Sequence, residues 1–213
     1  MIAVVLAMLV VSSAAFAWQP PTAAIDVDKS PIDRQPYRIR VLVASEVDAR
    51  LDARRRDELL AEWQSLVRRF VGTPWSIELL GEARAEALVL GGELEALDPA
   101  IVEPLGAGAD KVWLIRVSAS GAGLSFRGRE YDSTTRRLGP LQRRVATVVR
   151  DAPRVFLRFT LDLFAPYAEI GERFGKDVAI VVRGASLEPA SELGRLVAPG
   201  TIFQPMRLVA RKG

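Results

Sequence analysis

KVWLIRVSASGAGLSFRGREY, residues 111–131, is the stretch that decides the fold. Its first half, Lys111–Ser118, is rich in apolar, β-branched and aromatic residues and predicts a strand. Its second half, Leu124–Tyr131, predicts another strand, whose side chains alternate between two faces. Gly121-Ala122-Gly123 lies between them and is typical of a tight turn. The stretch therefore predicts an antiparallel hairpin within a larger sheet.

Strands and helices alternate upstream of this hairpin. Tyr37–Ala44 predicts a central strand, because Val41, Leu42 and Val43 are apolar on both faces. Arg54–Phe70 carries apolar side chains at helical spacing and is followed by Gly72-Thr73-Pro74, which ends a helix. Trp75–Leu80 predicts a second strand. Residues 82–105 favour two short helical pieces, since Gly91-Gly92 and Asp98-Pro99 interrupt them.

Strands dominate the segment downstream. Gln142–Val149 predicts a strand, and Pro153–Ile170 predicts a helix that Pro166 ends or kinks. Asp177–Arg183 and Ile202–Ala210 predict the last two strands. The expected order is β-α-β-α-β-β-β-α-β-β. This order is typical of an α/β or α+β protein with a mixed sheet and about three helices packed on it.

The first 36 residues predict an export signal and a linker. Met1–Val11 is an apolar run, and Ala15-Phe16-Ala17 is a small-x-small site, so residues 1–17 predict a signal peptide cleaved after Ala17. An uncleaved anchor or a core helix is the alternative. Residues 18–36 contain four prolines and predict an extended linker. Residues 37–213 then form one mixed α/β domain, in which 183–213 is the candidate for a terminal β-hairpin subdomain.

The absence of two residue types restricts the chemistry of the chain. It contains no His and no Cys among its 213 residues. This excludes Ser-His-Asp and Cys-His nucleophiles, thiol redox chemistry and Cys/His zinc sites. Carboxylate and lysine chemistry and oxygen-ligated Mg or Ca remain open. We expect no cofactor, no metal site and no catalytic residue.

Arginines gather around FRGREYDSTTRRLGPLQRRV, residues 126–145. Ten arginines and three acids lie between Arg116 and Arg158, while the whole chain carries a net charge of +3. Such a surface favours an anionic partner, namely an envelope protein, an anionic polymer or an anionic lipid. The alternative is an ordinary solvated face that Glu130, Asp132 and Asp151 neutralise. The predicted partner-binding residues are Arg127, Arg129, Arg136, Arg137, Arg143 and Arg144.

Two acids in the same stretch are candidates for catalysis. Glu130 and Asp132 share one face of a strand, with their carboxylates about 6–7 Å apart, a spacing that suits an inverting glycosidase. However, the neighbouring arginines are expected to hold both acids ionised, whereas a general acid needs a raised pKa. We therefore expect Asp132 to build the Ser-Thr-Thr turn that follows it. Nucleic-acid binding is not expected, because the arginines lack interleaved aromatic residues for base stacking.

Residues 108–136 resemble a pattern in periplasmic domains of the TolB amino-terminal, CsgG and FlgT kind. The matching features are Gly108-Ala109-Asp110 at the end of a helix, the strand Val112–Val117, and the aromatic-Asp-x-x-Thr turn that begins at Tyr131. The resemblance extends to Val178–Gly184 and to the turn at Val197–Phe203. It implies an αβ domain used for assembly in the cell envelope, with no catalytic residues to carry over.

These observations together predict a non-enzymatic, exported interaction or assembly module of the cell envelope, periplasmic or secreted, without a transmembrane helix in its mature chain. Its basic hairpin face would contact an anionic partner. Two alternatives remain open. One is a carboxylate-based hydrolase of a glycan or an anionic substrate, and the other is a protein that lies on an anionic membrane surface.

Overall fold

The computed structural model describes residues 30–46, 51–81, 88–90 and 93–206. The predicted signal peptide (1–17), its cleavage site at Ala17 and most of the predicted linker lie outside the described residues. The remaining end of that linker, residues 30–36, forms a 3-10 turn, η2 (Ile32–Arg34), rather than an extended arm. This turn packs on the domain, because Ile32 O and Asp33 O accept hydrogen bonds from the backbone of Gly184 (3.0 Å) and Ser186 (2.8 Å).

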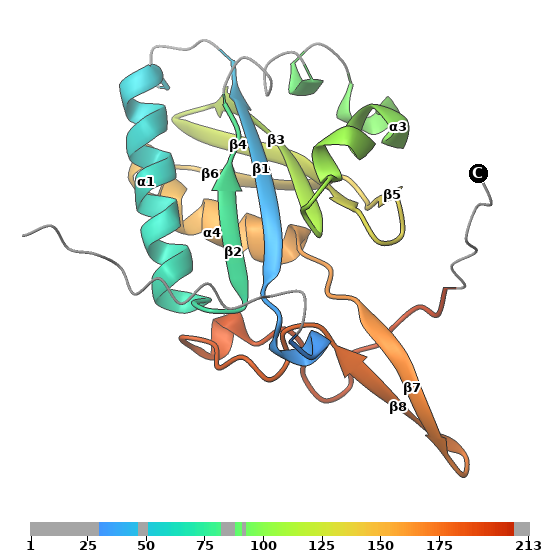
Figure 1. Cartoon of the computed structure of the whole chain (residues 1–213). Coiled ribbons are helices and arrows are strands. Elements are labelled where there is room, and N and C mark those ends of the chain that lie inside the picture. Colours follow the sequence, from blue (N-terminus) through green and yellow to red (C-terminus); the bar gives the residue numbers. More distant parts are fainter. Residues whose placement is uncertain (1–29, 47–50, 82–87, 91–92, 207–213) are drawn as a thin grey trace, which may run out of the picture.

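The main sheet is mixed and has six strands (Figure 1). Its order is β2-β1-β3-β4-β5, and β6 also pairs with β4. β1 is parallel to both β2 and β3, whereas β4 is antiparallel to its three partners β3, β5 and β6. The strands are β1 (Tyr37–Ser45), β2 (Trp75–Leu79), β3 (Lys111–Ser120), β4 (Gly123–Asp132), β5 (Arg137–Leu138) and β6 (Gln142–Ala146).

Helices cover both faces of this sheet (Figure 1). On one face, α1 (Ala53–Phe70) and α4 (Ala152–Leu163) pack over Trp113 and Phe126. On the other face, the short turns η3 (Leu94–Ala96), α3 (Pro99–Val102) and η4 (Glu103–Gly106) pack over Leu114. A strand between two apolar layers must be apolar on both faces, which explains why Val41–Val43 is fully apolar and buried. The predicted mixed α/β fold is confirmed.

The predicted helix over 153–170 is too long. α4 ends at Leu163, and Phe164 is already extended, with φ −71° and ψ 125°. Pro166 supplies the reason, because proline lacks an amide hydrogen and disfavours helical angles in the residue before it. The chain then forms a strand, β7 (Ala168–Phe174), which pairs with β8 (Asp177–Val182) in a separate two-stranded sheet.

Two further strand predictions need correction. The strand predicted over 142–149 ends at Ala146, and Val149 begins a 3-10 turn, η5 (Val149–Asp151). The strand predicted over 202–210 does not form at 202–206, and the rest of it lies outside the described residues. The segment before it contains a 3-10 turn, η6 (Glu192–Gly194), and an isolated bridge between Gly72 and Pro189. The chain thus covers the end of α1 instead of adding a strand.

Candidate functional site

Arg127 and Arg129 lie on the face of β4 that η3 covers. Arg127 forms an ion pair with Glu95. Arg129 donates hydrogen bonds to the carbonyls of Leu94 (3.1 Å), Glu95 (3.1 Å) and Gly139 (2.8 Å). Both side chains therefore hold the covering turns onto the sheet, and their charges have partners within the protein.

Arg136 and Arg137 lie in the turn after β4. Asp132 Oδ1 accepts a hydrogen bond from the Thr135 amide at 2.6 Å, which closes this turn. Arg136 has φ 56°, in the left-handed region, and its guanidinium lies 3.2 Å from the Glu103 carboxylate. The Arg137 guanidinium lies 3.7 Å from Met206 Sδ.

Arg143 and Arg144 lie on opposite faces of β6. Arg143 is opposite Arg127 and shares its face, whereas Arg144 is opposite Phe126 and points toward α4. Arg144 forms an ion pair with Asp162 of α4. Arg143 is exposed, and its side chain makes no ion pair or hydrogen bond with any described residue. Of the six predicted arginines, Arg143 is the one whose side chain has no polar partner among the described residues, and the side chain of Arg137 meets only a thioether there.

The two acids proposed for catalysis meet a lysine. Lys111 Nζ lies 3.0 Å from Glu130 Oε1 and also bonds Asp132. Trp113 Nε1 donates to Glu130 Oε2 at 2.9 Å, and the Ala165 amide donates to Glu130 Oε1 at 3.2 Å. The expectation that arginines hold these acids was wrong, because the described arginines of β4 lie on the other face or engage other partners.

The charged side chains of this cluster are buried, so they bond one another inside the fold. The side chains of Lys111 and Glu130 are 1% and 5% exposed. Burial raises the pKa of Glu130, against the effect of the Lys111 ammonium. Burial alone would lower the pKa of Lys111, but the carboxylates of Glu130 and Asp132 outweigh it, and the pKa of Lys111 is raised. A raised carboxyl pKa suits a general acid, but this carboxyl is closed to solvent in the folded state.

A second buried pair adjoins the first. Arg183 Nη2 lies 3.1 Å from Asp110 Oδ2, and both side chains are at least nine-tenths buried. Asp110 Oδ2 also accepts the amide of Arg38 at 2.8 Å, and Arg183 donates to the carbonyl of Pro36. The Tyr37 ring joins the two pairs, since Lys111 and Arg183 both lie within 6 Å of its centroid. We call Asp110, Lys111, Glu130, Asp132 and Arg183 the buried charge network.

Sequence reasoning missed the roles of Lys111 and Arg183. The sequence predicts both only as strand residues, at the start and at the end of apolar runs. In the sequence, each of these residues is a single charge directly beside an apolar strand. This pattern indicates a buried ion pair, because a charge that is buried with the strand needs a partner of opposite charge.

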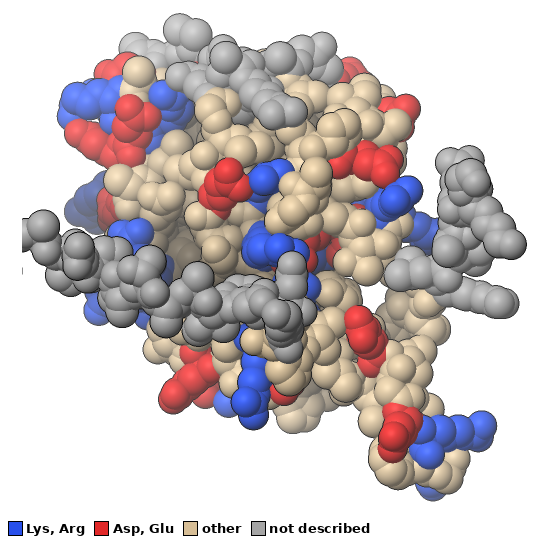
Figure 2. All heavy atoms as spheres, viewed as in Figure 1, with Lys and Arg blue, Asp and Glu red and all other residues tan. Residues whose placement is uncertain are grey.

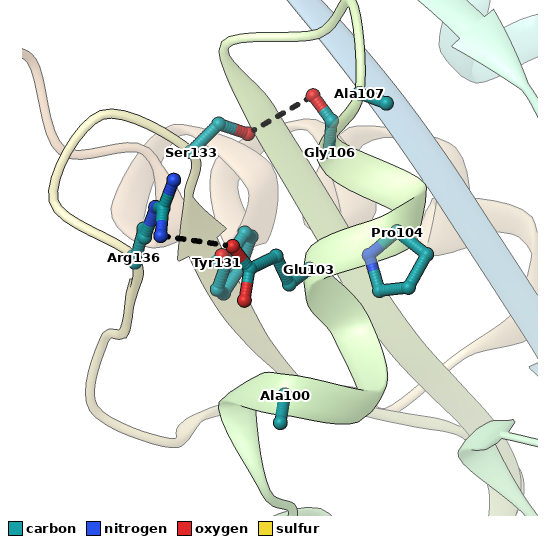
Figure 3. A pocket seen from close by; sticks show the side chains of 8 residues that line it. All are labelled: Ala100, Glu103, Pro104, Gly106, Ala107, Tyr131, Ser133 and Arg136. Carbon is teal, nitrogen blue, oxygen red and sulfur yellow. Dashed lines mark hydrogen bonds and ion pairs between the residues drawn. The ribbon is translucent and has the colours of Figure 1, made fainter. Parts of the chain in front are cut away.

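A pocket of about 440 Å³ lies beside the turn after β4 (Figure 3). Its ionisable groups Glu103 and Arg136 point toward one another and form the ion pair described above, and Ser133 donates to Gly106 O at 3.4 Å. Burial raises the pKa of Tyr131, which keeps this phenol neutral. The pocket is lined by Ala100, Glu103, Pro104, Gly106, Ala107, Tyr131, Ser133 and Arg136.

The described residues contain neither a cluster of metal-ligating acids nor a membrane-spanning helix. No group of three or more Asp or Glu side chains in them is arranged to hold a metal ion. No helix among them is long and apolar enough to cross a membrane.

Comparisons with known proteins reveal only distant structural likeness. No protein-family model matches the chain, and no curated protein matches it. TolB from Acinetobacter baumannii is 12% identical with a TM-score of 0.38, over 61% of this chain and 28% of that one. Lipoprotein GNA1162 from Neisseria meningitidis is 20% identical with a TM-score of 0.33, over 55% of this chain and 84% of that one.

The C-terminal domain of LpoB from Salmonella enterica is 12% identical with a TM-score of 0.32, over 53% of this chain and 84% of that one. Of the families that the sequence resembles, TolB is represented among these structures. The chain spans only about a quarter of the TolB chain that it matches. At TM-scores below 0.5, these likenesses carry no argument about what the chain binds.

Proposed function

We propose that this protein is a non-enzymatic interaction module that acts outside the cytoplasm and binds an anionic partner at a basic edge. The basic edge consists of Arg143 on β6 and of Arg154 and Arg158 on α4. β6 and α4 pack against one another at an edge of the main sheet, with Arg143 on the face of β6 that points away from α4 and Arg154 and Arg158 at exposed positions of α4. The apolar run and the small-x-small site at residues 1–17 support export.

The observation that carries the proposal is the imbalance of charge in this region. Residues 143–162 contain five arginines and two aspartates. Both aspartates already have partners, because Asp162 pairs with Arg144 and Asp151 lies 3.8 Å from Arg150. The three arginines of the basic edge are exposed, and none of their side chains makes an ion pair or hydrogen bond with a described residue. Like charges without counterions repel, and an anionic partner relieves that repulsion.

The chemistry of guanidinium suggests the kind of partner. Arginine presents a planar fork of donors that matches carboxylate and phosphate groups. An acidic envelope protein or an anionic polymer with repeated carboxylates or phosphates offers several such groups at once. Arg143 has room to bind one of them, whereas Arg127 and Arg129 are already engaged by η3.

The position of the acids supports a non-enzymatic role. The Glu130–Asp132 pair, the candidate for glycoside hydrolysis, is held by Lys111 within the buried charge network. In the pocket, Glu103 is paired with Arg136. Glu130 is closed to solvent, and Glu103, although it faces the pocket, is held by the Arg136 guanidinium, whereas a general acid or base must reach the proton that it transfers.

A binding assay with two matched triple variants tests the proposal. Arg143→Ala/Arg154→Ala/Arg158→Ala removes the basic edge. Arg54→Ala/Arg68→Ala/Arg195→Ala removes the same charge from exposed positions elsewhere. Each protein is sedimented with purified peptidoglycan, with a soluble polyanion and with vesicles that contain anionic lipid, at increasing salt concentration.

We expect the wild-type chain to bind a carboxylate- or phosphate-rich polymer in a salt-sensitive way. The basic-edge variant should lose this binding and the control variant should keep it. Equal loss in both variants would mean that net charge alone acts, which contradicts the proposal. Binding to vesicles alone would replace the polymer with a lipid surface. Turnover of a glycan that Glu130→Gln abolishes would refute the non-enzymatic role.

A further inference from the structure

The hairpin of β7 and β8 stands apart from the main sheet. Among the described strands, β7 and β8 pair only with each other. Figure 1 shows the pair projecting away from the rest of the fold. A two-stranded hairpin is marginally stable in water, and three or more strands or a packed face are needed for stability. The projecting part of the hairpin therefore lacks the support that a sheet normally has.

The hairpin exposes large apolar side chains. Ile170 is 67% exposed and Phe174 is 63% exposed. Ile170 and Ile180 are cross-strand partners, so they lie on one face, and Val178 shares that face two residues before Ile180. Val178 and Ile180 are each 48% exposed. A contiguous apolar group of this kind marks an interaction site.

The outer edge of β8 is open for strand pairing from Val178 to Val181, and η2 lies beside the end of the strand. Val178–Val182 contains no charged residue and no proline, which are the residues that natural edge strands use to prevent pairing. Apart from the pairing with β7, the backbone of residues 178–181 makes no hydrogen bond with any described residue. This edge presents a row of donors and acceptors beside an apolar face.

We propose that β8 pairs in antiparallel fashion with β8 of a second copy of this chain. The product is one four-stranded sheet in the order β7-β8-β8-β7, built around a two-fold axis. A register centred on Ile180 places it opposite itself and places Ala179 opposite Val181. Every pair in the middle of the new ladder is then apolar, and Asp177 stays outside it.

Charge argues against a membrane as the occupant, and the apolar pairs of the self-complementary register favour a second copy. Residues 168–182 contain three acids and two bases, a net charge of −1. Figure 2 shows charges of both signs at the tip of the hairpin and mostly uncharged surface along its length. An anionic membrane attracts a basic segment, and insertion of this tip would bury carboxylates. The hairpin shares no residue with the basic edge, so this inference stands independently of the proposed anionic partner.

Sedimentation velocity of the purified protein tests the inference. Two variants are compared with the wild type, and each replaces one isoleucine with lysine. Ile180→Lys places a charge opposite its own copy in the new ladder, and like charges directly opposite are destabilising. We expect it to weaken dimerisation by about tenfold or more. Ile202→Lys makes the same change at a position that is 94% exposed and outside the hairpin, and it should leave the dimer unchanged.

Disulfide trapping locates the interface, because the chain contains no other cysteine. Ile180→Cys should form a covalent dimer on mild oxidation, since directly opposed Cβ atoms lie about 5 Å apart. Ile170→Cys serves as the control. In the proposed sheet the two copies of residue 170 are three strand spacings apart, about 14 Å, which is too far for a disulfide.

Three results would overturn the proposal. The first is a wild-type chain that stays monomeric at the highest concentration reached. The second is a dimer that persists in Ile180→Lys, and the third is a dimer that crosslinks through residue 170 rather than residue 180. Binding of a monomeric chain to neutral vesicles, lost in Ile180→Lys, would assign the hairpin to a membrane instead.

Discussion

Replacement of Lys111 by methionine tests the buried charge network directly. Methionine keeps the length and apolar stem of the side chain and removes only its ammonium. That ammonium bonds Glu130 at 3.0 Å, the carbonyl of Ala165 at 2.7 Å, and Asp132. Lys111→Met therefore leaves a buried carboxylate without its cation.

The magnitude follows from burial. Removing one partner of a buried ion pair costs about 3–5 kcal/mol, because the other charge remains in a medium of low dielectric constant. Screening by solvent gives no reason to reduce this figure, since the Lys111 and Glu130 side chains are 1% and 5% exposed. We expect the free energy of unfolding of Lys111→Met to fall by about 3–5 kcal/mol, a large part of the stability of a typical domain.

Urea denaturation followed by tryptophan fluorescence measures this change. Lys176→Met, at the exposed tip of the hairpin, is the matched control and should change the midpoint little. The pH dependence gives a second reading. Without the ammonium, burial raises the pKa of Glu130 further in the folded state, so the native variant binds its proton more tightly than the unfolded chain does.

The stability deficit of Lys111→Met should therefore narrow as the pH falls from about 8 to about 5, because protonation removes the unpaired charge. A loss of less than about 1 kcal/mol near neutral pH would refute the assignment of a buried ion pair. A deficit that is independent of pH would show that the lysine acts through packing rather than through charge.

Three further predictions concern the core. Phe156→Ala should lower the free energy of unfolding by about 3–5 kcal/mol in urea denaturation, because its ring is fully buried. Gly128→Ala should cost about 1–3 kcal/mol in the same assay, since a Cβ there would lie 2.7 Å from the carbonyl of Leu114. Burial raises the pKa of Tyr37, so above pH 10 the unfolded chain loses a proton that the native state keeps. Stability should thus fall with rising pH in an alkaline titration, and Tyr37→Phe should flatten this fall; an equal slope in both proteins would contradict it.

The strands of the main sheet could be predicted where a local pattern and the tertiary environment agree. Val41–Val43 is apolar on both faces, and β1 lies between two packed layers. The glycines before Leu124 predict a turn, and Gly121 adopts φ 55° there. In these segments each residue's own preference points to the structure that forms.

The hairpin of β7 and β8 could not be predicted in full, because its first strand has a weak local signal. Residues 168–174 read AEIGERF, with Ile170 as their one β-branched residue. The preceding helical pattern extends to Phe164 and therefore predicts a helix that continues past it. Pairing with Val178 and Ile180 of β8 decides the conformation of β7. A local hydrophobic pattern within residues 168–174 cannot reveal that pairing.

The partners of the arginines were beyond sequence reasoning for a similar reason. Arg127 pairs with Glu95, which is 32 residues away, and Arg144 pairs with Asp162 on a helix that packs beneath its strand. Like charges that are close in the sequence repel one another only if their neighbours in space carry the same charge. Here the fold brings acids from other elements to the arginines, and only exposed positions such as Arg143 keep the character that the sequence indicates.

The buried charge network explains how a hairpin that projects from the domain can still be held in place. The segment before β7 is fixed at Ala165, whose carbonyl and amide bond Lys111 and Glu130. The segment after β8 is fixed at Arg183, which pairs with Asp110 at 3.1 Å and donates to the Tyr167 hydroxyl. Both ends of the hairpin are therefore anchored to the start of β3 by buried charges, whose directional bonds specify a single arrangement where apolar packing alone would tolerate several. An apolar edge that must meet a partner strand gains from such an anchor, because less conformational freedom is then lost on binding.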